Sequence, residues 1–265
     1  MPKTSNINLL SANRLIESEE KNIVRRVKSL KKQPHLALVW VGGDKQTKKF
    51  VEAKKRKATQ LGIQFNLHHF EDIEERQLSA LIGSLNQSKE VDGIIVQLPL
   101  PGKLRVGNIL SQIDPLKDVD VLNGGDFPHP TPTGIVEILK ENKVDLSSSK
   151  TCILGSGRLV GEPLAKIFKD NSWKHIVISN AAESKAEEIN TCDVLISATG
   201  VEGIVSEKMV NKDMVVVDGS GIDVDLNKIQ DRVRLITPAK GAVGPMTVLV
   251  LMENVVTSAE RQQGN

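Results

Sequence analysis

The run Asp-Gly-Ile-Ile-Val-Gln-Leu-Pro-Leu-Pro, residues 92–101, places an amide side chain at the end of a predicted strand. Gly93 to Val96 is a short apolar run rich in β-branched residues, which is typical of a buried strand in a parallel sheet. Pro99 and Pro101 have no N–H to donate to a neighbouring strand, so the strand ends before them. Ligands of open α/β sheets bind at such carboxyl ends, and the amide of Gln97 both donates and accepts hydrogen bonds. Spacing alone favours a simpler interpretation, a glutamine that caps its own loop.

A second set of candidate residues lies on a helix predicted over Thr47 to Leu61. Phe50 and Lys54 are one helical turn apart, so they share one face of this helix. A lysine turned into a cleft shifts its pKa readily and exchanges protons near neutral pH. The basic run that follows, residues 55–57, is most simply a solvated face, and spacing alone would place Lys54 in it.

A glycine-rich loop, Gly-Ser-Gly-Arg-Leu-Val-Gly-Glu-Pro at residues 155–163, stands between a predicted strand and a predicted helix. The strand is expected over Thr151–Leu154 and the helix over Leu164–Asp170. Glycines let the backbone approach a pyrophosphate, and a helix N-terminus offers free N–H groups with a partial positive charge. The spacing differs from the standard dinucleotide fingerprint, so the prediction of a nucleotide site depends on this strand–loop–helix context.

The choice between NAD and NADP is made at the end of the next strand. A carboxylate there would hold the ribose hydroxyls of NAD, whereas an arginine would favour the 2′-phosphate of NADP. This chain has Asn180-Ala181-Ala182, which supplies neither. Arg158 in the glycine loop is a candidate substitute. The residues alone leave the choice open.

Composition bounds the class of protein. The chain has 265 residues, 39% hydrophobic and 26% charged, enough for two modest domains or one large one. A net charge of +2 does not argue for nucleic-acid binding. Cys152 and Cys192 lie in apolar, strand-like runs, so we expect buried free thiols, and no metal-ligand spacing appears. The chain begins without a signal-like apolar segment and has no run that could span a membrane, which predicts a cytoplasmic protein.

The elements that position these residues alternate along the first part of the chain. An amphipathic helix is predicted over residues 11–32, and strand, helix, strand, helix and strand follow over 36–41, 47–61, 64–70, 74–85 and 93–96. This order indicates a parallel sheet. Dense prolines and glycines from Pro115 to Pro132 predict a linker, after which Thr133 caps a helix.

A second alternation begins at Thr151. Short β-branched or apolar runs at 151–154, 176–179, 194–197, 214–217 and 234–236 predict a second parallel sheet of the nucleotide-binding kind. The apolar stretch from Val248 to Ala259 predicts a final helix. The fold class is therefore α/β.

These motifs together resemble the bifunctional methylenetetrahydrofolate dehydrogenase/cyclohydrolase family (FolD-type). Residues 92–101 match its signature, Lys117-Asp118-Val119-Asp120 matches its Lys-Asp-Val-Asp, and Val243-Gly244-Pro245-Met246-Thr247 matches its Val-Gly-Pro-Met-Thr. The family's Ser-x-x-Tyr-x-x-x-Lys is similar to Thr47-x-x-Phe50-x-x-x-Lys54. The resemblance runs in order along almost the whole chain.

The chain resembles a shortened and divergent member. Phe50 replaces the family's tyrosine, which keeps stacking area but loses a hydroxyl. The segment after Asp120 is shortened, and Pro130 replaces a cysteine. The segment 218–223, Asp-Gly-Ser-Gly-Ile-Asp, stands where the family has Asp-Val-Gly-Ile-Asn, with one extra residue.

The resemblance implies two α/β domains with a cleft between them. Residues 1–127 would form a catalytic, folate-binding domain, joined by the C-terminal helix at 247–265. Residues 128–246 would form a Rossmann-like NAD(P)-binding domain.

The resemblance also implies roles for residues. Asp120 would anchor the amino-pyrimidine edge of the pterin, while Lys54 and Gln97 would place a water molecule. Implied for catalysis are Lys54, Gln97, Asp120 and Phe50. Implied for substrate binding are Thr47, Phe50, Gln97, Leu98, Pro99, Asp120, Val243, Gly244 and Pro245. Implied for cofactor binding are Gly155, Ser156, Gly157, Arg158, Leu159, Asn180, Thr199, Gly200, Ile222 and Thr247. No metal ligand is implied.

The implied function is oxidation of 5,10-methylenetetrahydrofolate with NADP, or with NAD, followed by hydrolysis of the methenyl product to 10-formyltetrahydrofolate. This is one-carbon folate interconversion, which feeds purine biosynthesis. A homodimer with a folate substrate, and without nucleic acid or membrane partners, is expected. Two alternatives stay open: a dehydrogenase that has lost the hydrolysis through Phe50 and the shortened loops, and a non-catalytic folate- or nucleotide-binding homologue.

Overall fold

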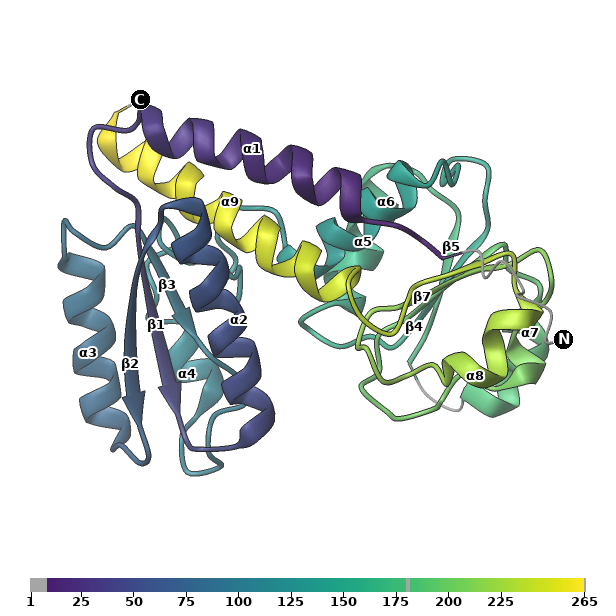
Figure 1. The fold of residues 1–265 in the computed structure, drawn as a ribbon. Helices are drawn as coiled ribbons and strands as arrows, with labels where there is room; N and C mark the ends of the chain where they lie inside the picture. The colour runs from purple at the N-terminus through teal and green to yellow at the C-terminus, as the bar shows by residue number, and fades with distance from the viewer. Residues whose placement is uncertain (1–8, 180–181, 265) are drawn as a thin grey trace, which may run out of the picture. The chain divides into compact units, whose positions relative to one another are not determined.

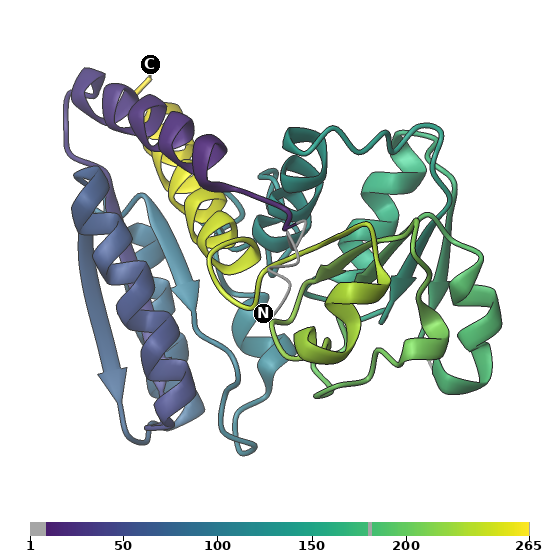
Figure 2. The same cartoon turned by 45° about the vertical axis from the view of Figure 1, so that its right-hand side comes forward.

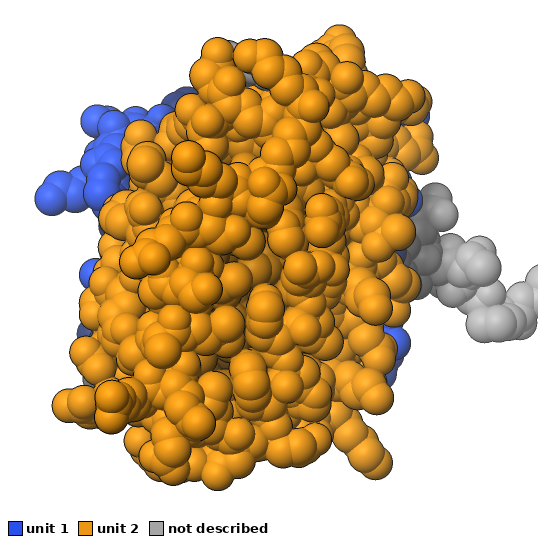
Figure 3. Space-filling view, turned by 90° about the vertical axis from the view of Figure 1, so that its left-hand side faces the viewer, with its two compact units in different colours: residues 1–16, 131–247 blue, residues 17–130, 248–265 orange. Residues whose placement is uncertain are grey.

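The structure, a computed structural model, describes residues 9–179 and 182–264 and divides into two compact units. Unit 1 contains residues 9–16 and 131–247, and unit 2 contains residues 17–130 and 248–264 (Figure 1, Figure 3). Residues 9–16 group with unit 1 because the Leu10 N–H donates to the Ile236 carbonyl at 2.9 Å and the Ser11 N–H donates to Asn142 Oδ1 at 3.0 Å.

Unit 2 is built on a parallel sheet of three strands in the order β2-β1-β3. The strands are β1 (His35–Val41), β2 (Gln64–Phe70) and β3 (Gly93–Val96). The central strand β1 is buried along its whole length, as its apolar sequence predicts. Beyond β3, the Ile94 N–H donates to the Lys117 carbonyl at 2.8 Å, so the chain near residue 118 runs parallel to β3.

Helices cover both faces of this sheet (Figure 1). Helices α3 (Glu75–Gln87) and α4 (Val106–Leu110) pack on the face that carries Val39 and Val96. Helix α2 (Lys45–Leu61) buries Val51, Ala58 and Leu61, which lie outside that core cluster. The Asp44 carboxylate caps α2 by accepting the Thr47 N–H at 2.7 Å, and Gly62 ends the helix in a left-handed conformation.

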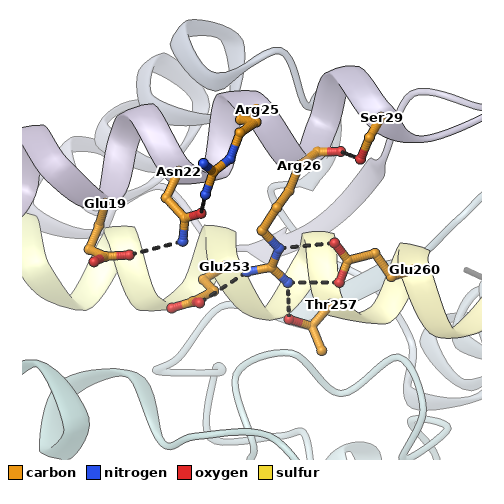
Figure 4. A network of polar contacts seen from close by, with 8 residues as sticks. All are labelled: Glu19, Asn22, Arg25, Arg26, Ser29, Glu253, Thr257 and Glu260. Carbon is orange, nitrogen blue, oxygen red and sulfur yellow. Dashed lines mark hydrogen bonds and ion pairs between the residues drawn. The ribbon is translucent and has the colours of Figure 1, made fainter.

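Residues 17–29 of α1 (Asn13–Ser29) and 248–263 of α9 (Val243–Gln263) complete unit 2 and lie side by side (Figure 4). Arg26 on α1 is the main polar link between them. Its guanidinium donates two hydrogen bonds to Glu260, at 2.9 and 2.8 Å, one to Glu253 at 3.0 Å and one to Thr257 at 2.7 Å. The planar fork of arginine matches the carboxylate of Glu260 at both oxygens.

Unit 1, seen from a second direction in Figure 2, is built on a parallel sheet. Its five strands follow the order β5-β4-β6-β7-β8. The strands are β4 (Thr151–Leu154), β5 (His175–Ile178), β6 (Val194–Ser197), β7 (Val215–Asp218) and β8 (Leu235–Ile236). With β4 first in the chain, this is a doubly wound order whose connections diverge between β4 and β6. Ligands of such sheets bind outside the carboxyl ends at that point.

The helices of unit 1 are α5 (Pro130–Glu141), whose first residue belongs to unit 2, α6 (Gly161–Asp170), α7 (Ala186–Asn190) and α8 (Leu226–Ile229). Short 3₁₀ turns cover Ala182–Lys185, Glu207–Met209 and Gln230–Arg232. Cys152 and Cys192 are buried in the core of this unit as free thiols.

The two-sheet α/β fold expected from the sequence is confirmed, but three helices begin at least three residues earlier than expected. Helix α5 begins at Pro130 rather than after Thr133, α6 at Gly161 rather than Leu164, and α9 at Val243 rather than Val248. Each of these helices has a proline in its first turn, where a missing N–H removes no helical hydrogen bond. Helix α4 was not predicted.

Within residues 9–179 and 182–264, no helix is long and apolar enough to cross a membrane. The same residues include no group of three or more His, Cys, Asp or Glu side chains placed to hold a metal ion.

Replacing Arg26 tests the link between α1 and α9. We expect Arg26→Ala to lower the free energy of unfolding by about 2 kcal/mol, because three acceptors on α9 lose a charged donor. Arg26→Lys should lose a smaller amount, since it keeps the charge without the fork. Urea unfolding followed by circular dichroism measures both.

The control is Arg25→Ala, which removes an exposed arginine. Within the described residues, the Arg25 guanidinium donates a hydrogen bond only to Asn22 on its own helix. We expect a change within about 0.5 kcal/mol. Equal losses for the Arg25 and Arg26 variants would show that the contacts with α9 do not stabilise the protein.

Candidate functional site

Lys54 and Gln97 meet at the carboxyl edge of the sheet in unit 2. The Lys54 Nζ donates to Gln97 Oε1 at 2.9 Å. Lys54 comes from α2, which follows β1, and Gln97 follows β3, which pairs directly with β1. The strand order reverses between these two strands, so the pair occupies the usual ligand position of an open parallel sheet.

The Gln97 amide is held from both sides. Its oxygen accepts from Lys54, and its Nε2 donates to the Leu98 carbonyl at 2.8 Å. Gln97 therefore caps its own loop, as the simpler interpretation expects, and it also contacts the candidate residue Lys54. The two hydrogen bonds fix which end of the amide faces the lysine.

Asp120 joins the pair. Its Oδ2 lies 4.0 Å from the Lys54 Nζ, and the two side chains are 25% and 11% exposed. The structure thus brings together the lysine, the amide and the carboxylate that the sequence placed 66 residues apart, from position 54 to position 120. Each lies in unit 2.

A buried turn presents Asp120. The Asp118 carboxylate is fully buried and accepts the N–H groups of Leu122 at 3.2 Å and Asn123 at 2.5 Å. Burial raises the pKa of Asp118, while these backbone donors act in the opposite direction. Val121 has a left-handed backbone with a φ of +57°, which closes the turn directly after Asp120.

Lys117 anchors the same turn to α3. Its buried Nζ donates to the carbonyls of Asn86 at 2.8 Å and Ser88 at 2.6 Å, at the C-terminus of that helix. Carbonyls at a helix C-terminus carry partial negative charge, which suits an ammonium group. Burial lowers the pKa of Lys117.

The remaining predicted substrate residues of unit 2 surround this edge. Thr47 is buried in the first turn of α2, so its side chain supports the helix start. Phe50 is 51% exposed, one turn from Lys54, with its ring available for stacking. Leu98 and Pro99, joined by a cis peptide bond, lead the chain away from Gln97.

The glycine loop of unit 1 fits a dinucleotide backbone. A Cβ on Gly155 would lie 2.6 Å from the Ala198 carbonyl oxygen, and a Cβ on Gly161 would lie 2.0 Å from the Gly155 carbonyl oxygen. Gly157 has no atom within 4 Å of the position of its missing Cβ. The loop therefore folds tightly against β6 and the start of α6, and it is open around Gly157, which matches a phosphate cradle at a helix N-terminus.

The other predicted cofactor residues of this edge follow neighbouring strands. Ser156, Arg158 and Leu159 lie in the exposed part of the glycine loop after β4. Thr199 and Gly200 follow β6, and Ile222, 43% exposed, follows β7. Asn180 lies outside the described residues.

The last predicted group lies at the start of α9. Val243, Gly244 and Pro245 form its first turn, and Thr247 follows on the same helix. The Thr247 hydroxyl donates to the Val243 carbonyl at 2.9 Å and lies 3.1 Å from the Thr131 hydroxyl, at the start of α5. These residues belong to unit 1, so the predicted substrate residues are divided between the two units.

Asp118 and Asp223 have structural roles at these edges that the sequence analysis did not indicate. Asp118 was named only as part of the Lys-Asp-Val-Asp motif, yet its carboxylate accepts the hydrogen bonds that hold the turn carrying Asp120. Asp223 was named only as the last residue of a segment that differs from the family pattern. In the structure it is fully buried and accepts hydrogen bonds from the loops after β6 and β7. The available signal was an acid beside apolar residues, since Asp118 precedes Val119 and Asp223 stands between Ile222 and Val224.

Gly161 is tightly packed in the glycine loop, whereas Gly157 has open space at the position of its missing Cβ. We expect Gly161→Ala to lower the free energy of unfolding by about 3 kcal/mol, because its Cβ would overlap backbone atoms. Gly157→Ala is the matched control, with an expected change within about 0.5 kcal/mol. Thermal unfolding measures both, and equal melting temperatures would contradict the described loop.

Comparisons with known proteins agree with this arrangement. Residues 10–120 match the model of the tetrahydrofolate dehydrogenase/cyclohydrolase catalytic domain, and residues 129–263 match that of its NAD(P)-binding domain. The chain is 35% identical to the bifunctional protein FolD of Hydrogenobaculum, over 97% of this chain and 100% of that protein. It is 32% identical to the bifunctional protein FolD of Bacillus subtilis, over 92% and 94%.

Solved structures show the same similarity. The bifunctional enzyme FolD, a methylenetetrahydrofolate dehydrogenase/cyclohydrolase from Campylobacter jejuni, is 30% identical with a TM-score of 0.87, over 96% of this chain and 98% of that one. A 5,10-methylenetetrahydrofolate dehydrogenase from the silkworm Bombyx mori is 27% identical with a TM-score of 0.88, over 97% and 99%. The chain belongs to the tetrahydrofolate dehydrogenase/cyclohydrolase family.

Proposed function

We propose that the protein oxidises 5,10-methylenetetrahydrofolate with NADP and hydrolyses the resulting 5,10-methenyl compound to 10-formyltetrahydrofolate. The observation that carries this proposal is the hydrogen bond from Lys54 to Gln97 with Asp120 beside it, in a chain that matches both domains of the family. The roles below are assigned to these residues on that basis.

Asp120 holds the substrate. A carboxylate with two oxygens accepts two N–H bonds from the amino-pyrimidine edge of a pterin. The side chain is 25% exposed, so one oxygen can turn toward Lys54 while the group still reaches a ligand. Phe50, on the same helical face as Lys54, supplies stacking area for the flat ring system.

Lys54 and Gln97 act on the hydrolysis. Water adds to the methenyl carbon, whose positive charge is shared with N5 and N10. A C–O bond forms and the C–N5 bond breaks. One water proton moves to N5 and the other leaves to solvent, so the formyl group remains on N10. The Lys54 Nζ is 11% exposed and aimed by Gln97, so it can direct the water and relay its proton.

The dehydrogenase step needs mainly orientation. A bound nicotinamide dinucleotide would supply the acceptor for the hydride of the methylene carbon. The glycine loop, Thr199, Gly200 and Ile222 would hold the dinucleotide at the carboxyl edge of the sheet in unit 1. The match of residues 129–263 to the family's NAD(P)-binding domain supports a nicotinamide dinucleotide. We propose NADP as the preferred cofactor and NAD as the second, on the resemblance to the family.

The proposed organisation follows the same resemblance. Residues 1–127 with the C-terminal helix at 247–265 would be the catalytic domain, and residues 128–246 the NAD(P)-binding domain. We propose a cytoplasmic homodimer that acts on a small folate, without nucleic acid or membrane partners.

A second candidate is a dehydrogenase without the hydrolysis. Phe50 favours it, because this ring is exposed next to Lys54 and lacks the hydroxyl of the family's tyrosine. One lost hydrogen bond is worth about 0.5–1.5 kcal/mol, which slows a reaction by roughly two- to tenfold. That magnitude weakens hydrolysis without abolishing it, so the bifunctional enzyme is preferred.

The overall reaction can be measured on the wild-type protein. Purified protein with 5,10-methylenetetrahydrofolate and NADP should produce reduced cofactor without lasting accumulation of the methenyl absorption band. The same assay with NAD establishes the cofactor preference. Reduced cofactor with accumulating methenyl compound would support the dehydrogenase alone. Binding of folate and cofactor without reduction of either nucleotide would contradict the proposal and support a non-catalytic homologue.

Phe50→Tyr tests the cost of the missing hydroxyl. We expect this variant to hydrolyse methenyltetrahydrofolate about two- to tenfold faster, because one hydrogen bond is restored near Lys54. Stopped-flow decay of the methenyl band, measured without nicotinamide cofactor, gives the rate. The control is Phe65→Tyr on β2, away from the carboxyl edge, which should leave the rate unchanged. A slower Phe50→Tyr enzyme would show that position 50 does not take the family's role.

A further inference from the structure

A single buried carboxylate connects the two loops that carry predicted cofactor residues in unit 1. Asp223 is fully buried. Its Oδ2 accepts the Ser197 hydroxyl at 2.5 Å, the Thr199 N–H at 2.7 Å and the Thr199 hydroxyl at 2.9 Å. Its Oδ1 accepts the Ser220 hydroxyl. Both oxygens are therefore engaged, by donors from the end of β6 and from the loop after β7.

These hydrogen bonds also fix the direction of the hydroxyl groups. A carboxylate is only an acceptor, so Thr199 must donate its hydroxyl proton to Asp223. The oxygen of that hydroxyl then accepts the Val201 N–H at 3.1 Å, which shapes the backbone on either side of Gly200. Hydrogen bonds from hydroxyl and backbone donors outweigh burial and lower the pKa of Asp223 below its usual value.

The backbone joins the same two loops. The Gly203 N–H donates to the Ile222 carbonyl at 2.9 Å, and the Val205 N–H donates to the Asp223 carbonyl at 3.1 Å. Val201 and Ile222 are 51% and 43% exposed, so each loop presents an apolar side chain at the edge where ligands of such sheets bind. Two exposed apolar groups beside a glycine backbone suit one face of a flat heterocycle.

We propose that Asp223 is a positioning residue for the dinucleotide, which holds the loop of Thr199 and Gly200 and the loop of Ile222 in their binding geometry. The inference rests on the proposed function, because it takes the ligand to be the nicotinamide cofactor. Asp223 itself is buried and does not contact the ligand.

Ser220 lies in a segment that departs from the family pattern. The segment 218–223 contains one residue more than the family pattern Asp-Val-Gly-Ile-Asn and ends in Asp rather than Asn. The added length places the Ser220 hydroxyl against Asp223 Oδ1, where a carboxylate accepts. Asp218 completes the loop by accepting the Gly221 N–H at 2.7 Å. The acid and its serine donor are thus complementary.

The test measures binding directly. Isothermal titration of the protein with NADP, without folate, gives a dissociation constant that does not depend on turnover. We expect Asp223→Ala to raise this constant at least tenfold, because four hydrogen bonds to two loops are lost. Asp223→Asn should remain within about threefold of wild type, since its amide oxygen still accepts and its amide group still reaches Ser220. In steady-state assays the Asp223→Ala effect should appear in the KM for NADP rather than in kcat.

The matched control is Asp145→Ala. Asp145 also accepts serine hydroxyls, from Ser147 at 2.6 Å and Ser148 at 2.8 Å, but it lies in the turn between α5 and β4, away from the carboxyl edge. We expect no change in NADP affinity. An Asp223→Ala protein with an affinity within twofold of wild type would overturn the proposal, and so would equal weakening by the Asp145 and Asp223 variants.

Ser220→Ala decides the question if Asp223→Ala does not fold. This variant keeps the carboxylate and all partners of Oδ2, and it should weaken NADP binding about threefold. Unchanged affinity would then overturn the proposal. A wild-type protein that binds NADP but does not oxidise methylenetetrahydrofolate would refute the proposed function and leave this test valid. A wild-type protein that does not bind NADP would refute both.

Discussion

Parallel strands all end at the same edge of a sheet, and this constraint determines where the chemistry of the protein can lie. In unit 2 it brings Gln97 at the end of β3 to Lys54 on the helix that follows β1. In unit 1 it brings the glycine loop after β4 against the Ala198 carbonyl after β6. Both pairs lie where the strand order reverses, so one topological rule places the catalytic candidates and the dinucleotide loop.

The strand ends are held by buried acids rather than by apolar packing alone. Burying a carboxylate is unfavourable unless hydrogen-bond donors surround it. Asp118 receives backbone N–H groups and folds the turn that presents Asp120. Asp223 receives hydroxyl and backbone donors and joins two cofactor loops. In each case the donors come from the segment that must be held, so the group that needs partners also organises the loop around it.

The pKa values of Asp118 and Asp223 shift in opposite directions, because the two carboxylates have different hydrogen-bond donors. Burial raises the pKa of Asp118, whose partners are backbone N–H groups of one turn. For Asp223, the donors from Ser197, Ser220 and Thr199 overcome burial and lower its pKa. Asp223 therefore stays ionised as pH falls toward the usual range of a carboxyl group. The stability that its ionised form contributes is present above that range and is lost as pH falls through its lowered pKa.

Much of this could be predicted from the sequence because strands and motifs are local signals. The runs at 64–70, 93–96, 151–154 and 194–197 form strands at those bounds, since short apolar or aromatic runs between turns define them. The helix starts at Pro130 and Gly161 were expected too late in the chain, because Pro130 was assigned to the linker and Pro163 to the glycine loop, whereas a proline fits a first helical turn. Ser197 and Thr199 lie 26 and 24 residues before Asp223, so these partners depend on how segments meet in space, which residue spacing does not encode.

The central claim is that Lys54, oriented by Gln97, carries the hydrolysis. Its most direct test is the decay rate of 5,10-methenyltetrahydrofolate with Lys54→Ala, compared with Lys55→Ala, its exposed neighbour on the same helix. The account predicts that Lys54→Ala loses hydrolysis by at least a hundredfold while NADP affinity is unchanged, and that Lys55→Ala behaves as wild type. A Lys54→Ala enzyme that hydrolyses the methenyl compound at the wild-type rate would contradict it.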